Sequence, residues 1–202
     1  MNKYELKKAI THYRFLAQKE IDLEKLVDGK FIGPRKLVKK DQIDFKDIID
    51  PIRPFFSEES SEDLDKHYVT TFRLGNLKKP VFMANSEKGT DIIAGIDLGA
   101  NLVKEGLIKN IDDIGHFLAK YKIGILDIFK EEEIEGLKKL DLRVYECIEC
   151  FELPNIGKPV CFFEMGMIIG ILTEITNKKV NADEIRCWTS GYSFCQFDVE
   201  II

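Results

Sequence analysis

Apolar side chains recur three or four residues apart at the start of the chain, over residues 2–27. They include Leu6, Ile10, Tyr13, Ala17 and Ile21. This period predicts an amphipathic helix, which Gly29 ends. Such a helix either packs on its own chain or contacts a partner.

The stretch at 30–66 shows no comparable period. Four of its residues disfavour regular structure: Gly33, Pro34, Pro51 and Pro54. An acidic run at 57–63 indicates a solvated loop. We therefore expect two parts, an N-terminal helix with an irregular extension at 1–60 and a ligand-binding domain at 61–202.

Polar and apolar residues alternate after this stretch. Alternation over 67–74, through Tyr68, Thr70, Phe72 and Leu74, predicts a strand, and 81–83 predicts a second, short one. Helical spacing then returns at 92–103, with Ser86 as its N-cap. A further helix is predicted from Asn110, which caps it, to Tyr121.

The remaining pattern predicts strands at 125–129 and 140–145, separated by an acidic turn at 131–135. A helix at 160–175 and a hairpin of strands at 180–188 and 194–201 follow. The order contains no repeated strand–helix–strand crossover. It therefore favours an α+β fold, with helices packed on an antiparallel sheet and an N-terminal helical extension.

Two of the predicted helices carry glycines four residues apart. They are Gly95 and Gly99 in the first, and Gly166 and Gly170 in the second. An interior glycine destabilises a helix by about 0.5–1 kcal/mol relative to alanine. A glycine face allows another backbone or a flat ligand to come close, so the pattern indicates either tight helix packing or a pocket wall.

Composition narrows the classes of protein. The chain has 202 residues, 45% of them hydrophobic, and a net charge of −5. Nucleic-acid-binding modules are usually basic, so none is expected. The longest apolar run, 165–172, is far shorter than the ~20 residues of a membrane span. The N-terminus lacks the apolar core of a signal peptide, so we expect a cytoplasmic protein. Abundant Lys, Glu and Ile favour a thermophilic source.

All five cysteines fall within 147–195: Cys147, Cys150, Cys161, Cys187 and Cys195. Gly191 suits the turn of the C-terminal hairpin, because it tolerates a positive φ. A three-residue loop there places Cys187 and Cys195 directly opposite each other, with Cβ atoms about 4.5–5.5 Å apart.

The cysteines allow three interpretations. Zinc prefers four tetrahedral ligands, which Cys161, Cys187 and Cys195 would supply together with Cys147 or Cys150. Alternatively, the thiols are small apolar groups around a pocket. A disulfide or redox pair is the third interpretation, although a reducing cytosol disfavours structural disulfides outside hyperthermophiles. Bulky apolar residues nearby, among them Phe162, Met165 and Trp188, line either a pocket or an ordinary core.

One segment resembles a known family. The run from Cys161 through Gly166 to Gly170, followed by Glu184-x2-Cys187-x3-Gly191-x3-Cys195-x-Phe197, resembles the 4-vinyl reductase domain family over residues 158–200. The resemblance implies an α+β fold shared with a Golgi-trafficking particle subunit and haem nitric-oxide sensors. It also implies binding of a small molecule such as a hydrocarbon, a dimer, and a metal at the three matching cysteines.

We therefore expect a non-enzymatic protein that binds an apolar small molecule beside a zinc site and forms a homodimer. Its pocket residues are expected to be Gly95, Gly99, Phe162, Met165, Gly166, Gly170 and Trp188. A reductase or an accessory factor of tetrapyrrole metabolism is an alternative, but the chain has no nicotinamide or flavin motif to deliver a hydride. An assembly adaptor is a second alternative.

Overall fold

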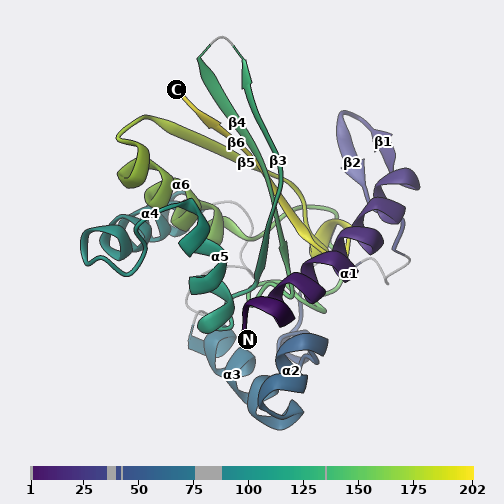
Figure 1. The fold of residues 1–202 in the computed structure, drawn as a ribbon. Coiled ribbons are helices and arrows are strands. Elements are labelled where there is room, and N and C mark those ends of the chain that lie inside the picture. The colour runs from purple at the N-terminus through teal and green to yellow at the C-terminus, as the bar shows by residue number, and fades with distance from the viewer. Residues whose placement is uncertain (1, 36–39, 42, 76–87, 135) are drawn as a thin grey trace.

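The computed structural model describes residues 2–35, 40–41, 43–75, 88–134 and 136–202 and has the expected α+β architecture (Figure 1). Its helices are α1 (Lys3–Asp22), α2 (Pro54–Ser60), α3 (Glu62–Gly75), α4 (Lys88–Lys104), α5 (Ile111–Lys120) and α6 (Phe162–Thr176). Its strands are β1 (Lys25–Val27), β2 (Lys30–Ile32), β3 (Ile125–Ile134), β4 (Leu137–Tyr145), β5 (Val180–Arg186) and β6 (Cys195–Ile201). Short 3-10 turns, η1 (Phe45–Asp47) and η2 (Trp188–Ser190), complete the described elements.

Four strands form one antiparallel sheet in the order β3-β4-β6-β5. Successive residues of a strand point to opposite faces, and β4 divides its side chains between two cores. Val144 lies in the core with α5 and α6, whereas Tyr145 lies in the core with α1. The helices α4 and α6 therefore cover one face of the sheet, and α1 crosses one end of the other face (Figure 1).

The first helix is shorter than predicted. It ends at Asp22, and the residues assigned to its last turn form the hairpin β1–β2. Asp28 and Gly29 both have positive φ, at 50° and 73°. An Asp-Gly pair suits the two-residue turn of a hairpin, so Gly29 forms part of a hairpin turn instead of ending a helix.

The prediction of a strand at 67–74 and irregular structure before it is wrong. Helices α2 and α3 occupy these positions, and the acidic run at 57–63 spans the end of one and the start of the other. In α3 the buried residues are Asp65, Val69 and Arg73, which are four apart and share one helix face.

The later predictions are largely confirmed. Asn110 caps α5 by accepting a hydrogen bond from the backbone N–H of Asp113 at 3.1 Å. The strand β3 continues to Ile134, through most of the expected acidic turn. The predicted strand at 81–83 and the N-cap Ser86 lie outside the described residues. None of the helices in the described ranges combines the length and apolarity of a bilayer-crossing segment.

Candidate metal centre

A tight contact between α4 and α6 fixes the position of α6. A Cβ atom built on Gly95 would lie 2.2 Å from the carbonyl oxygen of Phe163, and one on Gly166 would lie 2.2 Å from that of Ile92. Gly99 and Gly170 make equivalent approaches. All four predicted pocket glycines thus lie between two backbones, which is the tight packing that the sequence allowed. That a ligand binds there stays a prediction.

All five cysteine side chains converge at the start of α6, and all are buried and free. Cys147 and Cys150 lie in the turn after β4, Cys161 directly precedes α6, and Cys187 and Cys195 lie at the turn of the β5–β6 hairpin. The Sγ atom of Cys161 is 3.6 Å from that of Cys147, 3.8 Å from that of Cys187 and 3.6 Å from that of Cys195. The Sγ atoms of Cys150 and Cys195 are 3.2 Å apart.

These separations suit a single tetrahedral ion. Four sulfur ligands at about 2.3 Å from a zinc ion are about 3.8 Å from one another. Two overlapping groups have ligand atoms that all lie within 4.8 Å of one another. One comprises Cys147, Cys150, Cys161 and Cys195, and the other comprises Cys161, Glu184, Cys187 and Cys195. The buried cluster can therefore hold a metal ion.

Glu184 is the donor that the expected ligand set omitted. It lies on β5, and its Oε2 accepts a hydrogen bond at 2.8 Å from the backbone N–H of Cys161. Its Oε1 is buried without a hydrogen-bond partner among the described residues. Burial, followed by the proximity of Cys187, raises the pKa of this carboxyl well above its usual range. A bound cation would satisfy the unpartnered oxygen. The sequence signal was the Glu-x2-Cys spacing.

The cluster favours ionisation of some thiols and not of others. Burial opposes the charged form of every one of them. Hydrogen bonds from neighbouring thiols nevertheless hold the pKa of Cys147 and Cys187 below the ordinary value, while the pKa of Cys150, Cys161 and Cys195 lies above it. Thiolates are the form that binds metals.

Two arginines from the N-terminal part supply positive charge, and sequence analysis identified neither. Arg73 donates to the carbonyl oxygens of Ile148 (3.0 Å) and Phe151 (2.6 Å), in the turn that carries Cys147 and Cys150. Burial lowers its pKa to about 10, and these two cysteines oppose the shift. Arg73 therefore both shapes this turn and keeps a positive charge near it.

Arg35 reaches the cluster from the other side. Gly33 and Arg35 donate backbone hydrogen bonds to Ser190 and Gly191 at 3.2 and 3.1 Å. The guanidinium of Arg35 then lies over the ring of Trp188, 3.4 Å from its centroid. Burial lowers the pKa of Arg35 to about 10, and nearby Glu20, Cys150 and Cys187 oppose this. Like Arg73, it has buried N–H groups without partners among the described residues.

The other expected pocket residues lie around the thiols. Met165 is buried in the core, and Phe162 packs against it. Trp188 packs on Phe151, with ring centroids 4.4 Å apart. Its indole Nε1 is buried and has no hydrogen-bond partner in the described part of the chain.

The hairpin turn differs in detail from the expected three-residue loop. β5 ends at Arg186, and Cys187 begins the 3-10 turn, although the register Arg186↔Gln196 still points Cys187 towards Cys195. The positive φ expected of Gly191 is confirmed at 98°.

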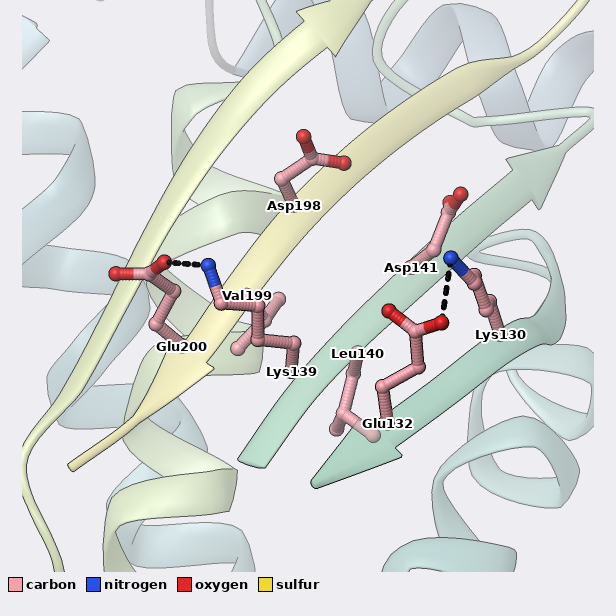
Figure 2. A pocket seen from close by; sticks show the side chains of 8 residues that line it. All are labelled: Lys130, Glu132, Lys139, Leu140, Asp141, Asp198, Val199 and Glu200. Carbon is pink, nitrogen blue, oxygen red and sulfur yellow. Dashed lines mark hydrogen bonds and ion pairs between the residues drawn. The ribbon is translucent and has the colours of Figure 1, made fainter. Parts of the chain in front are cut away.

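A separate, polar hollow lies on the open face of the sheet. Figure 2 shows its charged lining, with Lys130 paired to Glu132 and Lys139 paired to Glu200, each at 2.7 Å. It measures about 230 Å³. None of the expected pocket residues lines it, so it is distinct from the predicted apolar site.

Comparison with known proteins identifies the class. The family model of the 4-vinyl reductase domain matches residues 140–201. The uncharacterized protein MJ1642 of Methanocaldococcus jannaschii is 32% identical over 145 residues, which cover 72% of this chain and 83% of that protein. The uncharacterized protein MJ0150 of the same organism is 36% identical over 109 residues, covering 53% and 61%. The chain therefore belongs to the 4-vinyl reductase domain family.

Solved structures share the fold. The phenol-responsive sensory domain of the transcription activator PoxR, crystallised with phenol, aligns with a TM-score of 0.51 at 11% identity, covering 67% of this chain and 74% of that chain. A vinyl-4-reductase family protein from Methanocaldococcus jannaschii aligns with a TM-score of 0.46 at 19% identity, covering 67% and 80%.

Proposed function

We propose that this protein is a non-enzymatic small-molecule-binding module in which a zinc ion fixes the β5–β6 hairpin to α6. Cys161, Glu184, Cys187 and Cys195 hold the ion in this proposal. The observation that carries it is the convergence of their four donor atoms to within 4.8 Å of one another in a buried site. Three thiolates and a carboxylate in tetrahedral range suit zinc.

Four protein ligands support a structural role for the ion. Catalytic zinc sites keep a position open for water or substrate, whereas structural sites are closed. The ion would cross-link a helix start, a strand end and a hairpin turn. Because a metal site rarely exists in an unfolded chain, the binding free energy would add to the stability of the fold.

The ligand in this proposal has an apolar body and one hydrogen-bond acceptor. Phe162, Met165 and Trp188 offer apolar surface beside the thiols, and the unpartnered indole N–H of Trp188 offers a donor within the described residues. Binding sites commonly combine apolar walls with a few polar groups. The PoxR domain, which has the same fold, was crystallised with phenol, and this supports a ligand of similar chemistry.

The proposal includes a homodimer. On α4, Ile93 is 61% exposed and Leu98 is 39% exposed, in the helix layer that faces away from the sheet. Apolar residues on an outer helix support contact with a second copy. Light scattering coupled to gel filtration would report twice the 23.3 kDa chain mass; the monomer mass at micromolar concentration would reject the dimer.

Elemental analysis of the purified, reduced protein tests the metal site. We expect at least one zinc per chain in the wild type and none at this site in Glu184→Gln. Asp183→Asn is the matched control, because Asp183 is the exposed neighbour of Glu184 on β5. A metal-free wild type with undiminished stability would mean that the thiols are packing groups. Mass spectrometry of an organic extract tests the ligand, and incubation with a nicotinamide and a vinyl porphyrin is expected to leave the nicotinamide unoxidised.

A further inference from the structure

We propose that the same cluster holds a second divalent metal ion, bound by Cys147 and Cys150 and bridged to the first through Cys161 and Cys195. The inference extends the proposed function, because it takes the Glu184-containing site as the first of two. Together the two sites form a binuclear thiolate centre.

The geometry of the two ligand groups carries this inference. They share Cys161 and Cys195, whose Sγ atoms are 3.6 Å apart. Cys147 and Cys150 complete one group, and Cys187 with Glu184 completes the other. A thiolate sulfur has enough lone pairs to bind two cations. Two tetrahedra that share the Cys161–Cys195 edge therefore use all five thiols of the chain.

The Cys147–Cys150 pair is held in place before any ion binds. The backbone N–H of Phe151 donates to the carbonyl oxygen of Cys147, and that of Leu153 donates to Cys150, both at 3.0 Å. Arg73 binds two further carbonyl oxygens of this turn. A turn fixed in this way presents both sulfurs on one side, which lowers the entropy lost when they bind an ion.

Charge supports the count of two. Five thiolates and the Glu184 carboxylate carry six negative charges, and two divalent cations leave a residual charge of two. Arg35 and Arg73 can neutralise this remainder, and each has buried N–H groups that lack partners among the described residues. Buried charges are tolerated where they are paired in this manner. One ion would leave Cys147 and Cys150 as neutral thiols, so the metal count separates the two arrangements.

The spacing also argues against an iron–sulfur cluster. In such clusters the cysteine thiolates are terminal ligands of irons that inorganic sulfide bridges. The Sγ separations of 3.2–3.8 Å match ligands of one shared ion and leave no room for a sulfide core between them.

Titration of the metal-free, reduced full chain with Co²⁺ tests the bridge directly. High-spin Co²⁺ gives thiolate charge-transfer absorption and a paramagnetic resonance signal. We expect absorption to rise up to two equivalents, while the resonance signal grows to one equivalent and then falls, because bridging thiolates couple the two spins. Elemental analysis of the zinc form should give two ions per chain.

Variants assign the ions. Cys147→Ser with Cys150→Ser should retain one ion and lose spin coupling, whereas Glu184→Gln removes a ligand of the other ion. Ile148→Val is the matched control, since Ile148 lies buried between the two cysteines and its side chain has no donor atom. One uncoupled ion in the wild type, retained by the double variant, would overturn the second site and leave the proposed function standing. An absence of bound metal would overturn both.

Discussion

Arg53 and Asp65 form a bidentate ion pair in which both side chains are wholly buried, with N–O distances of 3.0 and 2.7 Å. Arg53 also donates to the carbonyl oxygens of Lys122 and Glu146. Through these bonds, α3 is tied to the residue that directly precedes Cys147. A charged pair from the N-terminal half therefore helps to position the thiol cluster of the C-terminal half.

Removing one partner of this pair should be strongly destabilising. Asp65→Asn leaves the Arg53 charge buried without its counter-ion, and such changes lower the free energy of unfolding by about 3–5 kcal/mol. Denaturant unfolding followed by circular dichroism measures it. Glu62→Gln, which breaks the exposed pair with Lys66 on the same helix, should change stability by less than about 1 kcal/mol. Equal effects of the two changes would contradict the account.

The glycine contact predicts that α4 and α6 do not tolerate even a single added methyl group between them. In Gly95→Ala the new Cβ meets backbone atoms, which cannot rotate away as a side chain does. Overpacking of this kind typically destabilises by about 1–3 kcal/mol. Gly115→Ala on α5 is the control, because its nearest contact is an ordinary 3.8 Å. It should stabilise by about 0.5–1 kcal/mol, and thermal melts of both variants would show opposite shifts.

Metal removal should weaken the C-terminal hairpin first. Chelation of the wild type, or Cys187→Ser, should lower the melting temperature and speed amide hydrogen exchange in β5 and β6, because the ion links their turn to α6. An ion present at 100 times its dissociation constant contributes about 2.7 kcal/mol. If Cys187→Ser kept its full zinc content, Cys187 would not be a ligand.

The aspartates across the open sheet face predict a pH dependence. Asp141 lies opposite Asp198, which lies opposite Asp183. Burial raises the pKa of Asp141; Arg143 opposes the shift and Asp198 adds to it. Folding therefore favours the protonated acid, and stability falls as the pH rises from the ordinary value of about 3.9 through the raised pKa.

Asp141→Asn removes this loss. We expect it to stabilise the protein at pH 7 by about a few tenths of a kcal/mol, since water screens a partly exposed group, and to have no effect near pH 3. Unfolding curves at the two pH values measure the difference. The exposed Asp183→Asn should show a smaller difference between them, and an Asp141→Asn effect that is independent of pH would refute the electrostatic explanation.

The sequence predicted the C-terminal half well because its signals are local. Alternation marks β4 and β6, Gly191 marks the turn, and Asn110 marks a helix start. The helix α3 could not be found in this way. Its buried face consists of Asp65, Val69 and Arg73, so two of the three residues are charged, and their partners lie far away in the sequence. The hairpin β1–β2 did have a local signal, the Asp28-Gly29 pair.

The candidate site was predictable to a similar extent. Clustering of cysteines in the sequence pointed to the region where the structure brings the thiols together; that they bind metal stays a prediction. Glu184 could be found from its spacing to Cys187. Arg35 and Arg73 could not, because their approach depends on how the N-terminal segments pack against the turns at Gly191 and Ile148.

The order in which the chain is synthesised has a consequence for the thiol cluster. Arg53, Asp65 and Arg73 leave the ribosome well before Cys147, so the clamp that shapes its turn is available when that cysteine emerges. Both ligand groups require Cys195. A nascent chain thus exposes up to four reduced sulfurs before either group is complete, and during that interval premature oxidation competes with maturation.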